Sequence, residues 1–413
     1  MHKRLPYGLS NYEDIVEHGY AYVDKTRYIE LIERESNPYQ LLLRPRRFGK
    51  SLFLSMLESY YDLNKNDRFE ELFKGLHIYE NPTPERGKYA VLRFDFSGLD
   101  TASHDAFRKS FSTRVTECVI AFITKYPFIF NDAEHEINLY KKREPAVEIV
   151  HSVFLAASHR SIPIFVIVDE YDNFANNLIA AGKSYIDEVN AGGIVRTFYE
   201  ILKIGTTSIV KRIFITGVTP MMLDDLSSGF NISDNVSLLP YYNDVFGFTS
   251  DEVQQLAAET GIDLRLIDLD MERYYNGYRF SEFGKNRVYN PQMVLFLFKA
   301  VLQLGMQPRQ IIDGNLRTDY GRLRVIAENA ANRDRLLRIM LDGEIESMVI
   351  TSFSASDLQN EGYFVSFLFY LGMLTFGDCS DGLTRLRIPN YSVQTLYWEY
   401  MAQFLKNRAT GDK

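Results

Sequence analysis

Residues 41–62, LLLRPRRFGKSLFLSMLESYYD, predict the architecture of the chain. The apolar run from Tyr39 to Leu43 has the composition of a buried strand, and it enters a turn that is rich in arginine. The turn ends at Lys50-Ser51, after which apolar residues recur at the spacing of a helix packed on a sheet. Strand, loop and helix therefore follow in the order of a phosphate-binding loop.

The chemistry of such a loop explains its residue types. Backbone N–H groups at a helix N-terminus bind an anion, a lysine reaches the β- and γ-phosphates, and a hydroxyl binds Mg²⁺. In the pattern G-x-x-x-x-G-K-[ST] the first glycine falls at Arg44, so this turn begins with a side chain. A bare Gly-Lys-Ser also occurs in ordinary turns, and the flanking strand and helix support the functional interpretation. The candidate nucleotide-binding residues are Arg44, Pro45, Arg46, Arg47, Phe48, Gly49, Lys50, Ser51 and Leu52, with the three arginines expected at the phosphates.

The composition indicates a large globular protein with an acidic balance. Of the 413 residues, 46% are hydrophobic, enough for a large core and roughly two or three domains. The formal net charge of -8 gives no long-range attraction to nucleic acid or to an anionic membrane. Cys118 and Cys379 lack metal-ligand spacing, which predicts reduced core cysteines in a cytoplasmic protein. Neither an apolar leader nor a stretch of the ~20 residues that span a bilayer is visible.

A second informative stretch is the continuous apolar run from Ile162 to Val168, which ends in Asp169-Glu170-Tyr171-Asp172. Such a run predicts a parallel strand covered on both faces, and carboxylates at its end would lie in the ligand crevice of an open α/β sheet. We expect Asp169 to hold Mg²⁺, directly or through water, and Glu170 to orient and deprotonate the attacking water. The alternative is a strand followed by an acidic helix N-cap, which is common.

A third apolar run, Arg212 to Gly217, places Thr216 where a hydroxyl could sense the γ-phosphate or position water. An equally weighted alternative is that the Thr216 hydroxyl only hydrogen-bonds backbone groups of the following loop. Thr219 is a weaker candidate for the sensor. The segment from Asp244 to Phe248 is expected to supply a fifth strand. Thr249-Ser250-Asp251-Glu252 predicts a capping box that opens a new helix, and the domain boundary is placed there.

Several short motifs together resemble one known family. They are YVDKT (22–26), RPRRFGKS (44–51), DEYD (169–172), ITGVTP (215–220), FGFTSDEV (246–253), NGYRF (276–280), VYNP (288–291) and LRIPN (386–390). These motifs look like those of the predicted AAA-ATPase-like proteins, a mostly bacterial group, and they extend over nearly the whole chain. Pro-Arg-Arg before Gly-Lys-Ser also resembles the archaeal-type and STAND ATPases. The resemblance therefore implies that an arginine in place of the first glycine, as at Arg44, is usual in the family.

The resemblance implies an α/β fold, a P-loop NTPase of the AAA/ASCE type. The expected parallel sheet has about five strands in the order 5-1-4-3-2, with flanking helices. In this reading residues 1–38 are an N-terminal lead-in packed on the core and residues 39–248 are the ATPase domain. Residues 249–413 are a mostly helical lid with a winged-helix-like C-terminal region.

The resemblance also assigns roles to single residues. Lys50 and Ser51 match the Walker A lysine and hydroxyl, Asp169 and Glu170 match Walker B, and Thr216 falls at the first sensor. The expected catalytic residues are thus Lys50, Glu170 and Thr216, the metal ligands are Ser51 and Asp169, and the cofactors are ATP and Mg²⁺.

An arginine finger from the C-terminal region is a further expectation. Arg273, Arg279 and Arg287 could reach the nucleotide from a lid and stabilise charge in the transition state. The alternative, which we favour, is that Tyr274 to Phe280 form a tyrosine-rich turn packed on the core.

Relatives in this family commonly continue into a nuclease domain of the PD-(D/E)XK type. No Asp-x-Lys or Glu-x-Lys occurs in this sequence, and too few residues follow Pro389-Asn390 for another domain, so we expect no nuclease activity from this chain. The hypothesis is an ATP-binding protein with slow Mg²⁺-dependent hydrolysis that acts as a molecular switch. The alternatives are a nucleotide-gated scaffold with little turnover and a regulatory module that controls DNA access for a nuclease. Homo-oligomerisation and a nuclease or other protein partner stay open.

Overall fold

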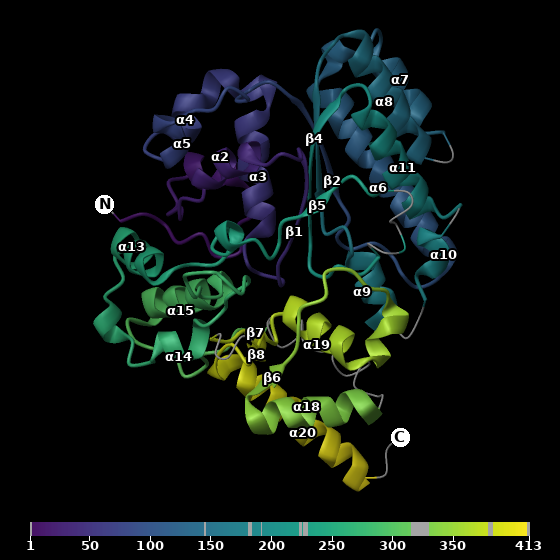
Figure 1. Cartoon of the computed structure of the whole chain (residues 1–413). Helices are drawn as coiled ribbons and strands as arrows, with labels where there is room; N and C mark the ends of the chain where they lie inside the picture. The colour runs from purple at the N-terminus through teal and green to yellow at the C-terminus, as the bar shows by residue number, and fades with distance from the viewer. Residues whose placement is uncertain are drawn as a thin grey trace.

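The computed structural model describes residues 2–143, 146–180, 184–190, 192–222, 225, 230–314, 330–378 and 383–410. Its centre is a parallel sheet of five strands in the order β2-β3-β4-β1-β5 (Figure 1). The strands are β1 (Tyr39–Leu43), β2 (Ala90–Asp95), β3 (Ile164–Asp169), β4 (Val210–Gly217) and β5 (Asp234–Asn235). The expected order is confirmed, because the strand of the loop and the strand of the acidic motif lie on either side of β4.

The expected position of the fifth strand was wrong. Asp234–Asn235 pairs with β1 at the edge of the sheet, whereas the segment from Asp244 to Phe248 forms no strand there. Gly247 adopts a left-handed φ of 88°, and Phe248 makes only an isolated antiparallel bridge to Tyr289. Because a left-handed residue interrupts an extended segment, the apolar side chains around it are buried without joining the sheet.

Helices cover both faces of the sheet (Figure 1). On one face α3 (Lys50–Tyr61) packs against β2 and β3. On the other face α6 (His104–Lys125) packs against β2 and α11 (Ile194–Thr206) against β4. The remaining elements before β4 are α1 (Tyr12–Glu17), α2 (Arg27–Arg34), η1 (Leu63–Arg68), α4 (Phe69–Phe73), α5 (His77–Glu80), η2 (Pro127–Ile129), α7 (Ala133–Tyr140), α8 (Val147–His159), α9 (Asn173–Ala180) and α10 (Ile186–Val189).

The chain after the sheet is mostly helical and lies at one end of it (Figure 1). A small antiparallel sheet in the order β6-β8-β7 is inserted among these helices. The helices are η3 (Pro240–Tyr242), α13 (Ser250–Thr260), η4 (Leu264–Leu266), α14 (Met271–Tyr275), α15 (Pro291–Leu304), α18 (Ala330–Asp342), η5 (Ala355–Gln359), α19 (Glu361–Tyr370) and α20 (Tyr391–Thr410). The strands are β6 (Glu344–Glu346), β7 (Thr375–Phe376) and β8 (Arg385–Arg387). The winged-helix character of this region stays a prediction.

Two hydrophobic clusters organise the core. The larger one joins the central sheet to side chains of α18, α19 and α20, and the smaller one joins α13, α14 and α15 to Ala21 of the N-terminal segment. The predicted capping box at Thr249 and Glu252 is confirmed and opens α13. The division of the chain into domains stays a prediction. Within the described ranges, no helix has the length and apolar character of a membrane span.

Candidate nucleotide site

The loop between β1 and α3 has the backbone of an anion-binding nest. Gly49 caps α3 in the left-handed conformation, with φ of 94°, and no side chain caps this helix end. Arg47 is also left-handed, with φ of 66°, which is uncommon for a residue with a side chain. Left-handed residues before a helix make successive N–H groups converge, and the helix dipole adds positive potential there. The loop therefore presents uncapped donors for an anion.

Lys50 lies in the first turn of α3 and is buried. Its Nζ donates to the carbonyl oxygens of Arg44 and Pro45, each at 3.0 Å. Burial lowers the pKa of Lys50, while the nearby carboxylates, chiefly Glu170 and Asp169, act to raise it. The ammonium is thus held over its own loop and faces the acidic motif across the site.

The Arg44 side chain is not where we expected it. It is 1% exposed, and its guanidinium donates to the carbonyl oxygens of Leu43 at 2.7 Å, Ser237 at 2.8 Å and Tyr242 at 2.7 Å. It also lies over the Phe280 ring, 4.5 Å from the centroid. Burial lowers the pKa of Arg44 to about 9. These partners occupy the guanidinium, and Arg44 is not among the residues that line the cavity described below. Its role at the phosphates stays a prediction.

The acidic motif follows β3, at the edge of the sheet where β1 also ends. Asp169 is buried, and its Oδ1 accepts a hydrogen bond of 2.7 Å from the Thr216 hydroxyl. Arg93 of β2 lies between Asp169, at 3.7 Å, and Glu58 of α3, at 3.4 Å. Since Arg93 touches both, Asp169 lies on the sheet face that α3 covers, which is the side of Lys50 and Ser51.

Glu170 points into the cavity from a left-handed backbone position, with φ of 54°. Its Oε2 accepts a hydrogen bond from the side-chain amide of Asn173. Burial raises the pKa of Glu170, while Lys50 and Arg46 act to lower it. A non-glycine residue in this conformation costs about 1–3 kcal/mol, and such strain concentrates at functional sites.

The second half of the acidic motif has a structural role. Asp172 accepts hydrogen bonds from the backbone N–H of Val218, at 3.0 Å, and from both the N–H and the hydroxyl of Thr219, at 2.7 Å each. The Tyr171 hydroxyl donates to the Thr219 carbonyl oxygen at 2.7 Å. Tyr171 and Asp172 therefore fix the loop after β4, and Thr219 serves that loop. Thr216 differs, because its hydroxyl reaches Asp169.

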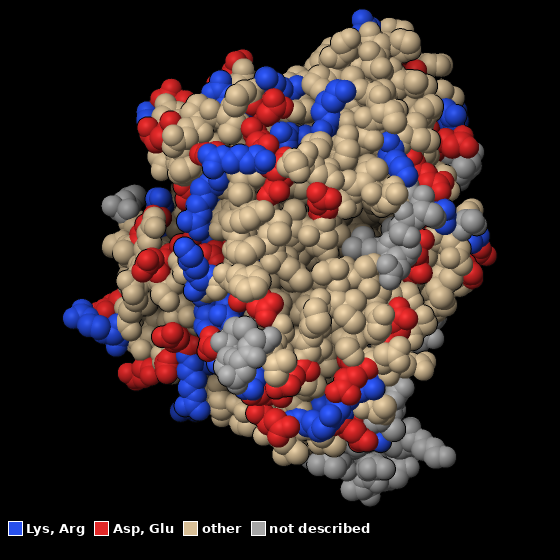
Figure 2. Space-filling model, viewed as in Figure 1, with Lys and Arg blue, Asp and Glu red and all other residues tan. Residues whose placement is uncertain are grey.

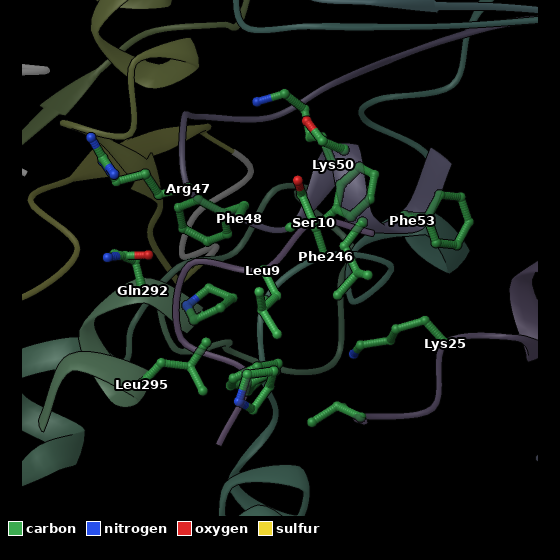
Figure 3. Close-up of a pocket in the computed structure, with 18 of the residues that line it drawn as sticks. Leu9, Ser10, Lys25, Arg47, Phe48, Lys50, Phe53, Phe246, Gln292 and Leu295 are labelled. Carbon is green, nitrogen blue, oxygen red and sulfur yellow. The ribbon is translucent and has the colours of Figure 1, made fainter. Parts of the chain in front are cut away.

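A cavity of about 420 Å³ opens beside the loop (Figure 3). This volume is within the range of small-molecule sites. Part of its lining, which we call the polar end, comes from the loop and the acidic motif: Arg46, Arg47, Phe48, Gly49, Lys50, Ser51, Leu52 and Glu170. The rest, which we call the apolar end, includes the polar residues Ser10, Lys25 and Gln292 but is mostly apolar: Pro6, Leu9, Ala21, Val23, Phe246, Phe248, Leu256, Pro291 and Leu295. In Figure 3 the labelled side chains of the N-terminal segment, the loop and α15 surround this space.

Several residues that line the cavity were not predicted from the sequence. Leu9 and Ser10 of the N-terminal segment and Gln292 and Leu295 of α15 line the cavity. Lys25 does so too; its Nζ bonds both oxygens of Glu252 on α13, at 2.7 and 2.8 Å. The YVDKT motif was the signal for Lys25, but its partner lies far away in the sequence. Nothing local marked the other four residues.

The candidate arginine fingers lie outside the cavity. Arg287 pairs with Asp378 at 2.7 Å and Arg279 with the same carboxylate oxygen at 3.5 Å. Arg273 lies over the Tyr391 ring, 4.8 Å from the centroid. Tyr278 is buried against Phe48, so the favoured alternative of a packed tyrosine-rich turn is confirmed.

The strand order, the loop before α3 and the acidic strand end define a P-loop NTPase fold. The family model for the predicted AAA-ATPases matches residues 6–227, so the chain belongs to this family. A relative from Azotobacter chroococcum mcd 1, described as an uncharacterized protein in the vnfD 5' region, is 28% identical over 402 residues. The match covers 95% of this chain and 68% of the relative.

Two solved structures are also similar. The Walker-type ATPase PABY2304 of Pyrococcus abyssi has a TM-score of 0.47 and 14% identity, over 91% of this chain and 94% of that chain. The ORC2 protein of Aeropyrum pernix, in ADPNP-ADP complexes, has a TM-score of 0.38 and 10% identity, over 97% of this chain and 94% of that chain.

Proposed function

We propose that the chain binds ATP with Mg²⁺ and hydrolyses it slowly, as a molecular switch. The observation that supports this most is the cavity itself, which Lys50, Ser51 and Glu170 line together with many apolar residues. The triphosphate of ATP requires positive charge and backbone N–H donors, and its adenine ring requires apolar surroundings. Both ends occur in one cavity of suitable volume.

The residues of the loop would bind the phosphates. The N–H groups at the start of α3 and the Lys50 ammonium supply positive potential at this end of the cavity. Arg46 and Arg47 line the same end and add charge. Lys50 would exchange the carbonyl oxygens of Arg44 and Pro45 for phosphate oxygens, which are better acceptors because they are charged.

The donor set also fits Mg²⁺. Ser51 offers a hydroxyl at the start of α3, and Asp169 offers a carboxylate on the face that α3 covers. Oxygen ligands of this kind, with water completing the shell, are what Mg²⁺ prefers. When bound, the ion would neutralise phosphate charge. Thr216 would hold Asp169 in place through its hydrogen bond to Oδ1.

Glu170 would act on the attacking water. Its Oε2 is held by Asn173, and Oε1 would take the proton of the water. The raised pKa of Glu170, caused by burial, brings the carboxylate closer to the basicity that a general base needs near neutral pH. Catalysis of this type is positioning plus electrostatics.

A nucleotide-gated scaffold with little turnover is the second candidate. The observation that favours it is the position of Arg273, Arg279 and Arg287, which pair with Asp378 or Tyr391 rather than line the cavity. Without a finger in place, hydrolysis by P-loop proteins is slow.

Calorimetric titration with ATP and Mg²⁺ tests binding. The wild type and Glu170→Gln should bind, and Lys50→Ala should lose most of the affinity, because Lys50 supplies the charge at the phosphate end. Lys74→Ala is a matched control, since Lys74 lies on the surface in an exposed pair with Glu70. Absence of ATP binding by the wild type would refute the proposed function.

A further inference from the structure

The nucleotide loop of this chain rests on residues of the NGYRF motif. Phe48 is buried, and its ring meets the rings of Tyr278 and Phe280 edge-on, with centroids 4.9 and 5.2 Å apart. The Arg44 guanidinium lies over the Phe280 ring, 4.5 Å from its centroid. Two residues of the loop are thus packed on a turn that lies more than 200 positions later in the sequence.

Hydrogen bonds join the turn to two other segments of the C-terminal region. The Arg279 N–H donates to the Thr375 hydroxyl at 2.6 Å, and the Phe376 N–H donates to the Arg279 carbonyl oxygen at 3.2 Å, which joins the turn to β7. Asn390 donates to the Asn276 carbonyl oxygen at 2.9 Å, which joins it to the start of α20. The NGYRF and LRIPN motifs therefore form one rigid support.

The C-terminal region also approaches the loop at a second point. A Cβ atom added at Gly372, at the end of α19, would lie 2.8 Å from the Pro45 side chain. Gly372 is left-handed, with φ of 78°, so this close approach occurs at a position that suits only glycine. Arg44, Pro45 and Phe48 thus all contact the C-terminal region.

A physical reason for this arrangement lies in the loop. The first glycine of the usual pattern is replaced by Arg44, and Arg47 adopts a left-handed φ that costs energy for a residue with a side chain. A strained conformation persists only where the surroundings over-determine it. Here Pro45, two residues before the strained Arg47, and Phe48, directly after it, both contact the C-terminal region.

We propose that Arg44, Phe48 and Phe280 form a clamp that holds the loop in its phosphate-binding shape, in place of the first glycine. Phe280 is then a positioning residue for the nucleotide site, although it lines none of the cavity. Its effect on ATP affinity rests on the proposed function, whereas its effect on the shape of the loop does not. The C-terminal region becomes a component of the site.

Phe280→Leu tests the clamp, with Phe283→Leu as the matched control. Leucine refills most of the buried space at 280 but removes the ring that Arg44 and Phe48 contact. Phe283 lies in the same segment and is 74% exposed. Hydrogen exchange of the peptide that covers residues 44–52 is measured in the nucleotide-free protein, together with the Kd for ATP.

The clamp predicts faster exchange in the loop of Phe280→Leu and a Kd for ATP raised about tenfold, equivalent to about 1.4 kcal/mol. Exchange in β3 and β4 stays unchanged, which separates a positioning role from general destabilisation. Phe283→Leu behaves as the wild type does. Exchange and affinity in Phe280→Leu equal to those of the control would overturn the proposal.

Arg44→Lys is a second variant, for use if Phe280→Leu does not fold. Lysine keeps the positive charge but cannot span three carbonyl oxygens with a planar fork. The clamp predicts the same faster exchange in residues 44–52, and unchanged exchange contradicts it. If the wild type binds no ATP, the proposed function fails, and the exchange measurement still decides the clamp.

Discussion

At the scale of single residues, the site combines predicted and unpredicted contributions. Lys50, Ser51 and Glu170 line one cavity, as their positions in the sequence led us to expect. The direction of the Arg44 side chain could not be predicted, because it is set by Ser237, Tyr242 and Phe280, which are distant in sequence. A local sequence pattern can place a residue in a loop, but the direction of its side chain depends on residues that are distant in sequence.

The pH dependence of hydrolysis tests the role of Glu170. Burial raises the pKa of this carboxyl above its usual range, and only the deprotonated form accepts a proton from water. The rate of phosphate release should therefore fall as the pH is lowered through this raised pKa. A pH series from about 5 to 9 with saturating ATP measures it. Glu170→Gln should lose this acidic limb, and an identical limb in the variant would assign it to another group.

At the scale of elements, α13 is joined to the N-terminal segment by a buried pair. The side chains of Lys25 and Glu252 are 9% and 16% exposed. Glu252 also accepts from the Thr249 N–H as part of the capping box. The pair therefore fixes the start of α13 beside the apolar end of the cavity.

Lys25→Met should lower the free energy of unfolding by about 3–5 kcal/mol, because it leaves the Glu252 charge buried without its partner. Lys3→Met is the matched control, because its partner also lies on α13. Lys3 pairs with Glu259 of α13, but its side chain is 52% exposed, so its loss should cost at most about 1 kcal/mol. Denaturant titration measures both. Equal losses in the two variants would contradict a special role for the Lys25 pair.

The elements also show where sequence patterns fail. The strands β1, β3 and β4 were predictable, because continuous apolar runs mark parallel strands that are covered on both faces. β5 was not predictable, because its two residues, Asp234 and Asn235, are polar and lie at the sheet edge. The segment from Asp244 to Phe248 has the apolar composition of a strand, but its Val245 and Phe246 side chains are buried in an irregular segment instead.

At the scale of the whole molecule, the acidic net charge leads us to expect that this chain alone does not bind nucleic acid. The formal net charge is -8. On the face drawn in Figure 2, Lys and Arg side chains form a band along one side of a largely uncharged centre, with Asp and Glu side chains among and around them. Tight binding to duplex DNA requires several Lys or Arg contacts to phosphates.

Fluorescence anisotropy with a labelled DNA duplex checks this expectation. We expect no saturable binding at micromolar protein in about 0.15 M salt, with or without ATP. Binding that appears only with ATP and weakens steeply with salt would instead support the module that controls DNA access for a nuclease.

Segments that lie far apart in the sequence line the same cavity. The N-terminal segment, the loop after β1, the end of β3 and α15 each contribute to its lining. The residues of the loop and the acidic motif were predictable as part of one site, because they are confined to two short motifs. The apolar end was not, since apolar side chains in different helices are indistinguishable from ordinary core residues before the fold is known.

The most direct test of the account is Mg²⁺-dependent phosphate release from ATP by the wild type and by Glu170→Gln. The account predicts slow but measurable release by the wild type, abolished by chelation of Mg²⁺, and loss of at least about 100-fold in Glu170→Gln while ATP binding is kept. Equal release by the two proteins would contradict the assigned role of Glu170. ATP binding without release by the wild type would contradict hydrolysis and identify a nucleotide-gated scaffold.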